Sequence, residues 1–493
     1  MTPTRPSATR LIVMLAPILG CVLAGFLPAI GLAAEGAAIV ESHPAYSEPH
    51  VDWAAYGLLW AVPFAGLLLS IAVMPLMAPR LWHNHFGKVS AFWALAFLVP
   101  FGLRAGLAET AFEITHTALL EYFPFIILLF ALYTVSGGVR LRGALPCSPT
   151  VNTGLLGLGT GIASLMGTTG AAMLLIRPLL QANEGRRHNV HVVVFFIFLV
   201  ANIGGSLTPL GDPPLFLGFL KGVDFFWPTR HLLAPMLFVS ALLLAVFFMI
   251  DSYFFQKEGV PVAAGAMPKE GLAVEGIPNI VLLACIVGAV LLSGLWRPEI
   301  VLRVYHVPVE LQDLVRDGLL VAIAGLSMRL TSGESRKAIA FSWFPIIEVA
   351  KLFAAIFVTI IPAIGILRAG EHGVMAPLVD ALSTNGAPND HIYFWVTGTL
   401  SSFLDNAPTY LVFFNTAGGD PQALMGPFKS TLLAISMGAV FMGAMTYIGN
   451  APNFMVRSIA AERGIAMPSF FGYMLWSCSL LIPAFVLVTV IFL

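Results

Sequence analysis

The sequence predicts an all-α polytopic membrane protein made of two inverted-topology repeats, each with a re-entrant helical hairpin and a broken transmembrane helix. Two observations lead to this fold class. First, 58% of the 493 residues are apolar and only 10% are charged, against about 25% charged in a typical soluble domain. Second, one motif containing Gly and Pro occurs twice within apolar segments. The composition excludes a soluble enzyme, and a net charge of −1 leaves no basic surface for nucleic acid.

The first 34 residues have the pattern of a targeting segment. Arg5 and Arg10 precede the apolar run 11–30, and small residues follow it at 31–34. This order is typical of a cleaved secretory signal peptide, with an uncleaved N-terminal apolar anchor as the alternative. Residues 35–121 are expected to form an external segment and the first helices. The beginning of that segment contains no Lys or Arg, as is common outside the membrane.

Apolar runs of about 20 residues, which suffice to cross ~30 Å of hydrocarbon, predict the transmembrane helices. Uninterrupted spans are expected at 54–77, 88–104, 122–139, 230–255, 277–296, 317–330, 342–365 and 470–493. Four further apolar stretches contain Gly, Pro, Asn or Asp at mid-depth, at 150–182, 190–222, 393–416 and 430–461. Lipid cannot satisfy the backbone groups freed by such breaks, so these segments should line protein or a water-filled cavity. Function is therefore expected at the breaks.

An internal repeat connects two of the interrupted segments. Residues 205–216 (GSLTPLGDPPLF) align without gaps on residues 443–454 (GAMTYIGNAPNF), 238 positions further along, with the shared pattern G-x-x-T-x-x-G-[D/N]-x-P-x-F. The same offset places Ser164 and Thr168 on Ser402 and Asn406. The helix breaks are assigned to Gly205, Gly211, Pro214, Gly443, Gly449 and Pro452.

The repeat divides the chain into two units of opposite orientation. Repeat 1 is expected at 122–255 and repeat 2 at 342–493, joined by a linker and connecting helices at 256–341. Counting the crossings makes the first helices of the two repeats run in opposite directions. Their hairpins, 150–182 and 393–416, should then enter from the cytoplasm and from outside respectively. Paired broken segments in inverted halves are typical of secondary transporters whose site lies at the repeat interface.

Polar side chains at the breaks supply oxygen ligands. Thr208 and Thr446 offer hydroxyl oxygens at equivalent positions, and Asn406, Asn450 and Asn453 offer amide oxygens. Such ligands suit a hard cation such as sodium. The residues expected to bind the substrate or ion are Asp405, Asn406, Thr208, Asp212, Thr446, Asn450, Ser164, Thr168 and Ser402.

Asp212 and Asp405 are the two acids inside broken segments. Each acid at the bilayer centre costs about 2.5–3.5 kcal/mol, so a functional role is expected of Asp405. For Asp212 a functional role and a capping role both stay open, because it precedes two prolines as an N-cap residue does. A transported cation is expected at Asp405 and Asn406, and no tightly bound metal.

Other polar groups fit structural roles. Glu348 and Lys351 lie three residues apart within 342–365 and should pair on one helix face; a proton-carrying Glu348 is the alternative. His83 and His85 flank Asn84 in a predicted loop, where a surface position is expected. Arg177, near the end of the first hairpin, is expected to extend its charged end toward water.

A family resemblance rests on the repeated motif. Residues 202–216 (NIGGSLTPLGDPPLF) resemble the signature of the ion transporter superfamily, which includes NhaD-type sodium/proton antiporters, citrate and dicarboxylate carriers and arsenite permeases. Residues 402–408 (SFLDNAP) resemble an antiporter-like L-D-N-x-P motif. Over about residues 54–493 the chain is similar to the citrate-transporter-like subgroup. The dicarboxylate carriers place Ser-Asn-Thr in each hairpin, where this chain has residues 167–169 (GTT) and 405–407 (DNA). This difference argues against a dicarboxylate substrate.

These observations predict a secondary active transporter and not an enzyme. The first expectation is sodium (cation)/proton antiport by alternating access, with Na⁺ and/or H⁺ as the coupling ion and no cofactor. The alternative is a transporter of citrate or another organic or inorganic anion, coupled to sodium or protons. The expected partners are a small ion or anion and the lipid bilayer of a bacterial-type inner membrane. Nucleic acid is not expected, and a homodimer is one expected form of assembly.

Overall fold

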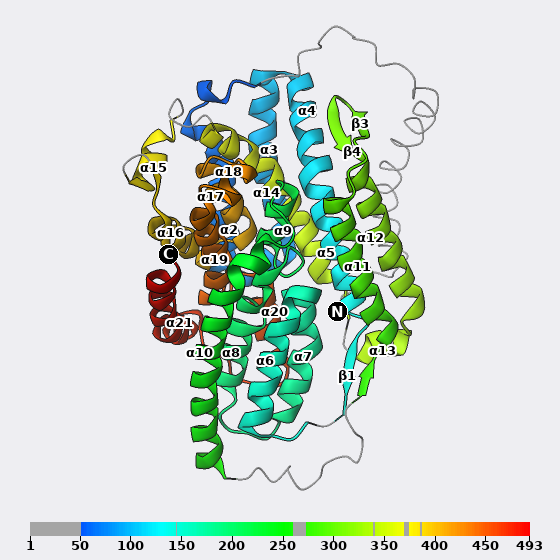
Figure 1. Ribbon diagram of the computed structural model, residues 1–493, viewed down its shortest axis with the longest axis vertical. Helices are drawn as coiled ribbons and strands as arrows, with labels where there is room; N and C mark the ends of the chain where they lie inside the picture. The colour runs from blue at the N-terminus through cyan, green and yellow to red at the C-terminus, as the bar shows by residue number, and fades with distance from the viewer. Residues whose placement is uncertain (1–50, 144, 260–272, 339–340, 369–373, 385–386) are drawn as a thin grey trace.

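The computed structural model describes residues 51–143, 145–259, 273–338, 341–368, 374–384 and 387–493. The predicted signal peptide or anchor at 1–34 lies outside them. Within the described residues the fold is all-α, as predicted, with eight helices long and apolar enough to cross a membrane (Figure 1). The strands form three two-stranded sheets, β1–β2, β3–β4 and β5–β6. The chain is therefore a multi-pass membrane protein.

The first helices lead into repeat 1 through an irregular turn. In order they are η1 (Trp53–Ala55), η2 (Leu58–Ala61), α2 (Val62–Met77), α3 (Pro79–Ala105) and α4 (Leu107–Thr117). One turn of π-helix, η3 (Ala118–Tyr122), joins α4 to α5 (Phe123–Ser136) without a break. The span predicted at 122–139 is therefore wrong at its start, because Leu107–Ser136 forms one span of 30 residues. Glu109 and His116 interrupt the apolar run in the sequence but not the helix.

Repeat 1 contains a helical hairpin and a broken helix, as expected. The hairpin is α6 (Pro149–Met166) and α7 (Thr168–Ala182), which meet at Gly167 with a φ of 80°. The broken helix consists of α8 (Val190–Leu199), η4 (Ile203–Leu207) and α9 (Pro213–Leu220). Helix α10 (Trp227–Glu258) comes next in the chain.

Repeat 2 has the same elements in the same order. They are α14 (Phe344–Arg368), the hairpin α16 (Asp390–Phe403) and α17 (Asn406–Thr416), the broken helix α19 (Lys429–Phe441), η7 (Met442–Met445) and α20 (Ala451–Glu462), and α21 (Phe470–Phe492). Short elements are inserted around them, namely α15 (Ala376–Ala381), β5 (Ser383–Thr384), β6 (Ala387–Pro388) and α18 (Pro421–Met425). The hairpins break at equivalent points, since α7 begins at Thr168 and α17 at Asn406.

The connecting region includes two long helices. Its elements are β2 (Ala273–Glu275), α11 (Ile277–Leu295), β3 (Val301–Val304), β4 (Val307–Glu310), α12 (Leu311–Leu330) and α13 (Gly333–Ala338). Strand β2 pairs with β1 (Arg140–Arg142) of repeat 1. The apolar run predicted as a span at 317–330 is only part of α12. That helix begins six residues earlier and carries Asp313 and Arg316 in its first two turns, and it is not among the eight candidate spans.

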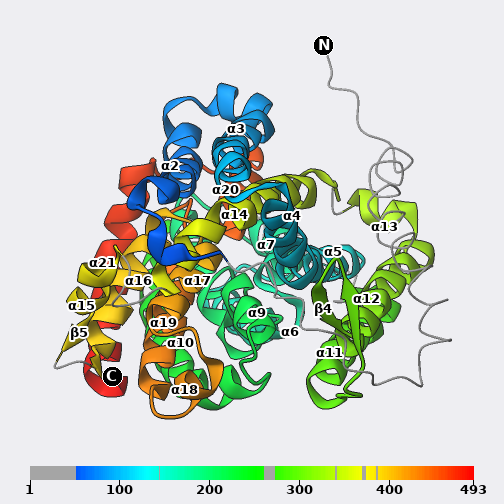
Figure 2. The ribbon, with the colours of Figure 1, turned by 90° about the horizontal axis from the view of Figure 1, so that it is seen from above.

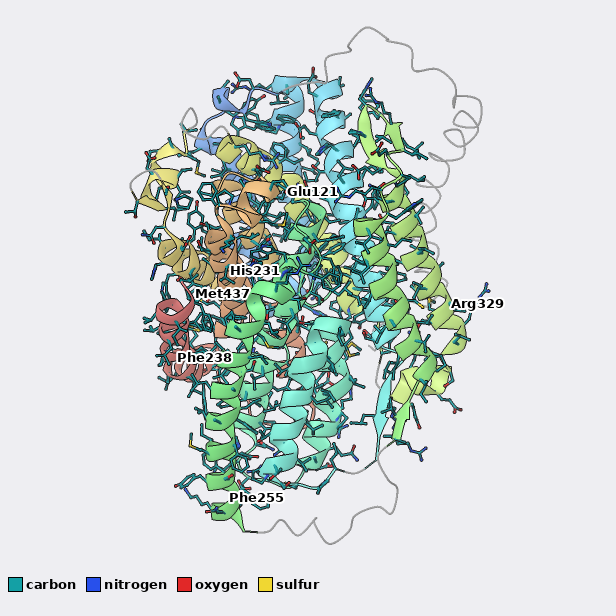
Figure 3. The ribbon with its side chains drawn as sticks, viewed as in Figure 1. Glu121, His231, Phe238, Phe255, Arg329 and Met437 are labelled. Atoms are coloured by element: carbon teal, nitrogen blue, oxygen red, sulfur yellow. The ribbon has the colours of Figure 1, made fainter. Side chains whose placement is uncertain are left out.

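The first helices of the two repeats run in opposite directions (Figure 1). Helix α5 lies between α4 near the top and β1 near the bottom, whereas α14 lies between α13 at the lower right and α15 at the upper left. Helix α10 descends, with His231 above Phe238 and Phe255 at its lower end (Figure 3). We call this lower end, with β1 and the end of α10, the basic end, because it carries Arg140, Arg142, Arg186 and Arg187. Its cytoplasmic orientation stays a prediction.

The broken helices occupy the centre of the protein. The span Val190–Leu207 is 89% buried, whereas the other seven spans are 22–56% buried. In the view from above, α9, α17 and α20 lie between α21 on one side and α11 and α12 on the other (Figure 2). Polar breaks are therefore enclosed by protein and kept away from lipid.

Candidate functional site

At the break of each broken helix, two glycines bring two backbone segments close together. A Cβ on Gly449 would lie 2.6 Å from the carbonyl oxygen of Gly443, and a Cβ on Gly211 would overlap the carbonyl oxygen of Gly205. Glycine is thus required because two backbone segments approach closely. The next half-helices begin with the predicted prolines, Pro214 in α9 and Pro452 in α20.

In each repeat, one threonine joins the break to the tip of the hairpin of the same repeat. The hydroxyl of Thr208 donates to the carbonyl oxygen of Ser164, and that of Thr446 donates to the carbonyl oxygen of Ser402. Each hydroxyl oxygen also accepts from a backbone N–H two residues on, at 3.2 Å. These four predicted site residues therefore stabilise the hairpin tips. The hydroxyl groups of Thr208 and Thr446 are already hydrogen-bonded within the protein.

The serines at the hairpin tips complete this support. Ser164 Oγ donates to the carbonyl oxygen of Gly204 at 2.6 Å, and Ser402 Oγ donates to that of Met442 at 3.0 Å. The two acceptors are 238 residues apart, as are the two donors. The sequence repeat thus corresponds to equivalent hydrogen bonds in both halves.

Asp212 lies where the two halves meet. Its Oδ1 accepts from the Thr168 hydroxyl at 3.1 Å and from Asn450 Nδ2 at 3.0 Å, and its Oδ2 accepts from Asn406 Nδ2 at 2.5 Å. The side chain is only 1% exposed. Although Asp212 occupies the N-cap position of α9, its side chain makes no capping hydrogen bond. The capping interpretation of Asp212 is therefore wrong, because the carboxylate faces both hairpins.

Asp405 has the capping geometry instead. Its Oδ1 accepts from the backbone N–H of Ala407 at 3.0 Å, in the first turn of α17. The residue is half-buried and lines the same cavity as Asp212. The two acids of the broken segments thus face one cavity, but Asp212 is the one that collects side-chain donors from both repeats.

Asn406 contributes an unsatisfied oxygen. It is fully buried, and its Nδ2 donates to Asp212 while its Oδ1 has no hydrogen-bond partner among the described residues. The orientation of the amide is set by this contact, because the opposite one would place two oxygens against each other. A buried amide oxygen without a partner costs about 1–3 kcal/mol, so this atom is a candidate ligand.

Two further asparagines connect the repeats: Asn453, which the sequence analysis named as a source of an amide oxygen, and Asn202, which it did not name for the site. Asn202 Nδ2 donates to Asn453 Oδ1 at 2.7 Å, and Asn450 Nδ2 donates to Asn202 Oδ1 at 3.2 Å. Asn453 Nδ2 donates to the carbonyl oxygens of Gly443 and Thr446 at 2.8 and 2.9 Å. The position of Asn202 after ten consecutive apolar residues, 192–201, was the available signal.

A cavity of about 110 Å³ adjoins these residues. We call it the site cavity; Thr168, Asp212, Asp405 and Asn450 line its polar part, and Tyr133, Pro345 and Ile346 are among its remaining lining residues. The last three lie at the end of α5 and the start of α14, toward the basic end. The volume has room for several water molecules, so a hydrated ion would fit.

The electrostatics of the site cavity combine helix ends and acids. Helices α7, α9, α17 and α20 each begin at a residue that lines the site cavity or that is next to a lining residue in the sequence. Their partial positive charges attract anions, and carboxylates already stand at two of them, α9 and α17. Among the described residues no group of three or more His, Cys, Asp or Glu could hold a metal ion. The site cavity thus combines the partial positive charge of four helix N-termini with two carboxyl groups.

A comparison with known families decides the class of protein. Residues 54–493 match a family described as "Putative citrate transport". The chain belongs to this citrate-transporter-like family. Proteins named "Uncharacterized transporter" from Mycobacterium tuberculosis and Mycobacterium bovis are each 25% identical to it over 406 residues, covering 80% of this chain and 84% of theirs. The expectation of a transporter is confirmed at this level.

The transporter has a second cavity of about 640 Å³ beyond α9, which we call the outer cavity. Its charged lining residues include Asp52, Glu113, Glu121, Lys221 and Arg368. Glu121, in the π-helical turn, accepts from Lys221 Nζ at 2.5 Å, and Arg368 Nε donates to Asn415 Oδ1 at 2.8 Å. Glu121 lies in the upper half of the protein (Figure 3). Two contacts therefore join α9 and α17 to their neighbours at the side away from the basic end.

The basic end of the transporter contains a buried ionic cluster that the sequence analysis missed. Asp251 accepts from Arg186 Nη1 at 2.5 Å and from Asn152 Nδ2 at 2.9 Å, and lies 2.9 Å from His191 Nε2. Arg186 Nε also contacts Glu258 at 3.3 Å. These contacts tie the base of the first hairpin to α10. The sequence feature that could have indicated this cluster is Asp251, an acid inside the apolar run of α10.

The remaining predicted polar groups have different surroundings. Glu348 and Lys351 form no ion pair in the described part of the chain, and Lys351 Nζ instead lies 5.6 Å from the centre of the Phe86 ring. The pairing prediction is therefore wrong. His83 and His85 are exposed, as expected, but lie within α3 and not in a loop. Arg177 is half-buried, and its Nη1 has no hydrogen-bond partner within the described ranges.

Proposed function

We propose that this transporter is a sodium (cation)/proton antiporter whose ion site is centred on Asp212. The observation that carries the proposal is the pairing of a buried carboxylate with the unpartnered Oδ1 of Asn406. Three donors occupy Asp212, which leaves about one of four lone-pair positions on a carboxylate free. Oxygen atoms of this kind are the ligands of hard cations.

The net charge around the site cavity favours a cation. Asp212 and Asp405 both line it, and among the described residues no Lys or Arg does. A carboxylate substrate about 5 Å from Asp212 would cost about 3 kcal/mol per pair of unit charges at an effective dielectric constant of 20. Sodium and protons would instead compete for the same carboxylate. This competition is the basis of exchange.

Alternating access would then expose Asp212 to one side of the membrane at a time. Sodium binding would neutralise the carboxylate from one side and protonation would neutralise it from the other. Removal of the negative charge lowers the cost of enclosing the site in a low-dielectric environment. The loaded and the protonated site are therefore the forms expected to change sides. We place the protein in a bacterial-type inner membrane with its basic end in the cytoplasm, and assembly as a homodimer stays a prediction.

A second candidate is transport of citrate or another anion, coupled to sodium or protons. It is favoured by the description of the family, by the four helix N-termini around the site cavity and by the unpartnered Nη1 of Arg177. In this case a cation bound at Asp212 would neutralise that carboxylate before the anion enters, which lowers the repulsion between the site and the anion. The two candidates therefore share the Asp212 site, and they differ in whether an anion binds after the cation and crosses with it.

Purified protein in proteoliposomes can separate the candidates. An imposed sodium gradient is expected to move protons in the opposite direction without citrate, and labelled citrate is expected to stay outside. Citrate uptake without sodium-driven proton movement would contradict antiport and establish the anion transporter. If the protein is shown to be folded and inserted, the absence of both fluxes would contradict both candidates.

Two matched substitutions test the position of the ion site. Asp212→Asn is expected to abolish sodium-driven proton movement, because it removes the carboxylate that faces both hairpins. Asp405→Asn is the control, since Asn caps a helix about as well as Asp; it is expected to change the apparent sodium affinity by less than about tenfold. Full activity of Asp212→Asn would place the ion elsewhere.

A further inference from the structure

The surface between α3 and α14 carries a groove of about 600 Å³, distinct from both cavities described above. We call it the α3–α14 groove. Its lining includes the small residues Gly87, Ala91 and Ala354. It also includes one lysine from each helix, Lys88 of α3 and Lys351 of α14. The helices pack against each other, and α3 lies at the edge of the protein in the view from above (Figure 2).

The charges at this groove are not balanced by the protein. Lys88, Lys351 and His85 line it, and no Asp or Glu in the part of the chain that the structure describes does. Both lysines are exposed, and in the described residues neither forms an ion pair. Glu348 is one turn away on α14 but does not line the groove. An ammonium group at a membrane-facing surface is costly unless it reaches water or a counter-charge.

The surroundings of the lysines are apolar and face outward. Only 22% of the apolar window of α3 is buried within the protein. Phe92, Leu95 and Val99 follow the groove along α3 and are 62%, 55% and 58% exposed. A ligand held by the lysines would therefore continue along an apolar surface of the kind that hydrocarbon covers.

We propose that the α3–α14 groove binds an anionic phospholipid, with its phosphate between Lys88 and Lys351 and its acyl chains along α3. Both lysines can extend from their helices toward a headgroup. Gly87 lets the two helices bring the lysines to one groove, because a Cβ on Gly87 would lie only 3.6 Å from Lys351 Cδ. Basic pockets between transmembrane helices on the cytoplasmic side are typical sites for acidic lipid headgroups.

Other occupants fit the groove less well. A soluble anion would meet the lysines but would leave the exposed strip of α3 without a partner. A second copy of the same surface would bring Lys88 and Lys351 against identical charges, which repel. The anionic lipid alone satisfies both the charge and the apolar surface.

Lipid binding to the purified full-length protein tests the proposal. Phosphatidylglycerol and phosphatidylcholine are titrated separately into the detergent-solubilised protein, and bound lipid is counted by native mass spectrometry. Two lysines at about 1 kcal/mol each correspond to an approximately 30-fold loss of phosphatidylglycerol affinity in Lys88→Gln/Lys351→Gln. The matched control is Lys257→Gln/Lys429→Gln, which removes the same charge from exposed lysines outside the groove.

Each outcome bears on the proposal. Loss of phosphatidylglycerol binding in the groove variant alone, with phosphatidylcholine binding weak throughout, supports it. Equal binding by both variants overturns it. Displacement of the lipid by glycerol 3-phosphate at similar concentrations also overturns it, because the groove would then recognise a soluble anion. A dimer that dissociates in the groove variant, with unchanged lipid binding, would assign the groove to a second copy.

Discussion

Breaking the Glu121–Lys221 ion pair should shift the transporter away from the conformation described above. Lys221 follows α9, and α9 begins beside Asp212, so this short helix links the ion site to the outer cavity. Glu121 belongs to the preceding π-helical turn, outside the broken helices. Since some lining residues of the site cavity lie toward the basic end, we expect the pair to hold the opposite side closed. Glu121→Gln removes the charge and keeps the shape.

The size of the effect depends on the burial of the pair. The side chains are 18% and 11% exposed for Lys221 and Glu121. Exposed pairs contribute up to about 1 kcal/mol, and truncating a fully buried pair costs about 3–5 kcal/mol. An intermediate value of about 2 kcal/mol corresponds to an approximately 30-fold shift in the ratio of the two conformations.

Thiol labelling can measure this shift. A cysteine replacing Thr169, which lines the site cavity, should react from the basic end in the starting protein and more slowly after Glu121→Gln. Glu109→Gln is the matched control, because Glu109 lies on the adjoining helix α4 and forms no ion pair in the described residues. Adding Lys221→Met to Glu121→Gln should cause little further change, since the pair is already broken. Unchanged labelling in Glu121→Gln, or additive effects of the two substitutions, would refute the reasoning.

Three further predictions concern the break, the basic end and the topology. Gly449→Ala should abolish transport with insertion intact, because its Cβ would lie 2.6 Å from the Gly443 carbonyl oxygen, whereas Gly154→Ala, with open space around it, should be tolerated; flux assays decide. Arg186→Met should destabilise the protein by about 3–5 kcal/mol, because it leaves Asp251 buried without its cation, and the exposed Arg187→Met should not; thermal unfolding measures the difference. Single cysteines at Arg142 and Pro421 should be labelled from opposite sides of the membrane, and labelling from one side would contradict the inverted repeats.

The sequence repeat was sufficient to predict where the helices break and which positions of the two hairpins correspond. Its offset of 238 residues connects Asp212 with Asn450, and these two side chains are hydrogen-bonded in the structure. The division of labour between the two acids could not be predicted. Asp212 and Asp405 both precede half-helices, and only the three-dimensional arrangement shows which carboxylate receives the side chains of the other repeat.

Contacts between distant parts of the chain were also beyond sequence reasoning. Glu121 and Lys221 are 100 residues apart, and neither lies in a repeated motif. The predicted Glu348–Lys351 pair had favourable helical spacing, but Lys351 lies against the aromatic ring of Phe86 on a different helix. Spacing along one helix cannot show which neighbouring helix a long side chain will reach.

The hydrogen bonds between the broken helices have a consequence for how cargo crosses the membrane. Asn202 bonds to Asn453, and Asp212 bonds to Asn406 and Asn450, so both repeats contribute to one enclosed network. Sliding one repeat past the other at this point would leave several buried polar groups unpaired, at about 1–3 kcal/mol each. The two breaks should therefore travel as one body, with motion confined to its boundary with α5 and α14. A bound ion would then keep the same ligands on both sides of the membrane, because the site and the ion would move together as one rigid unit.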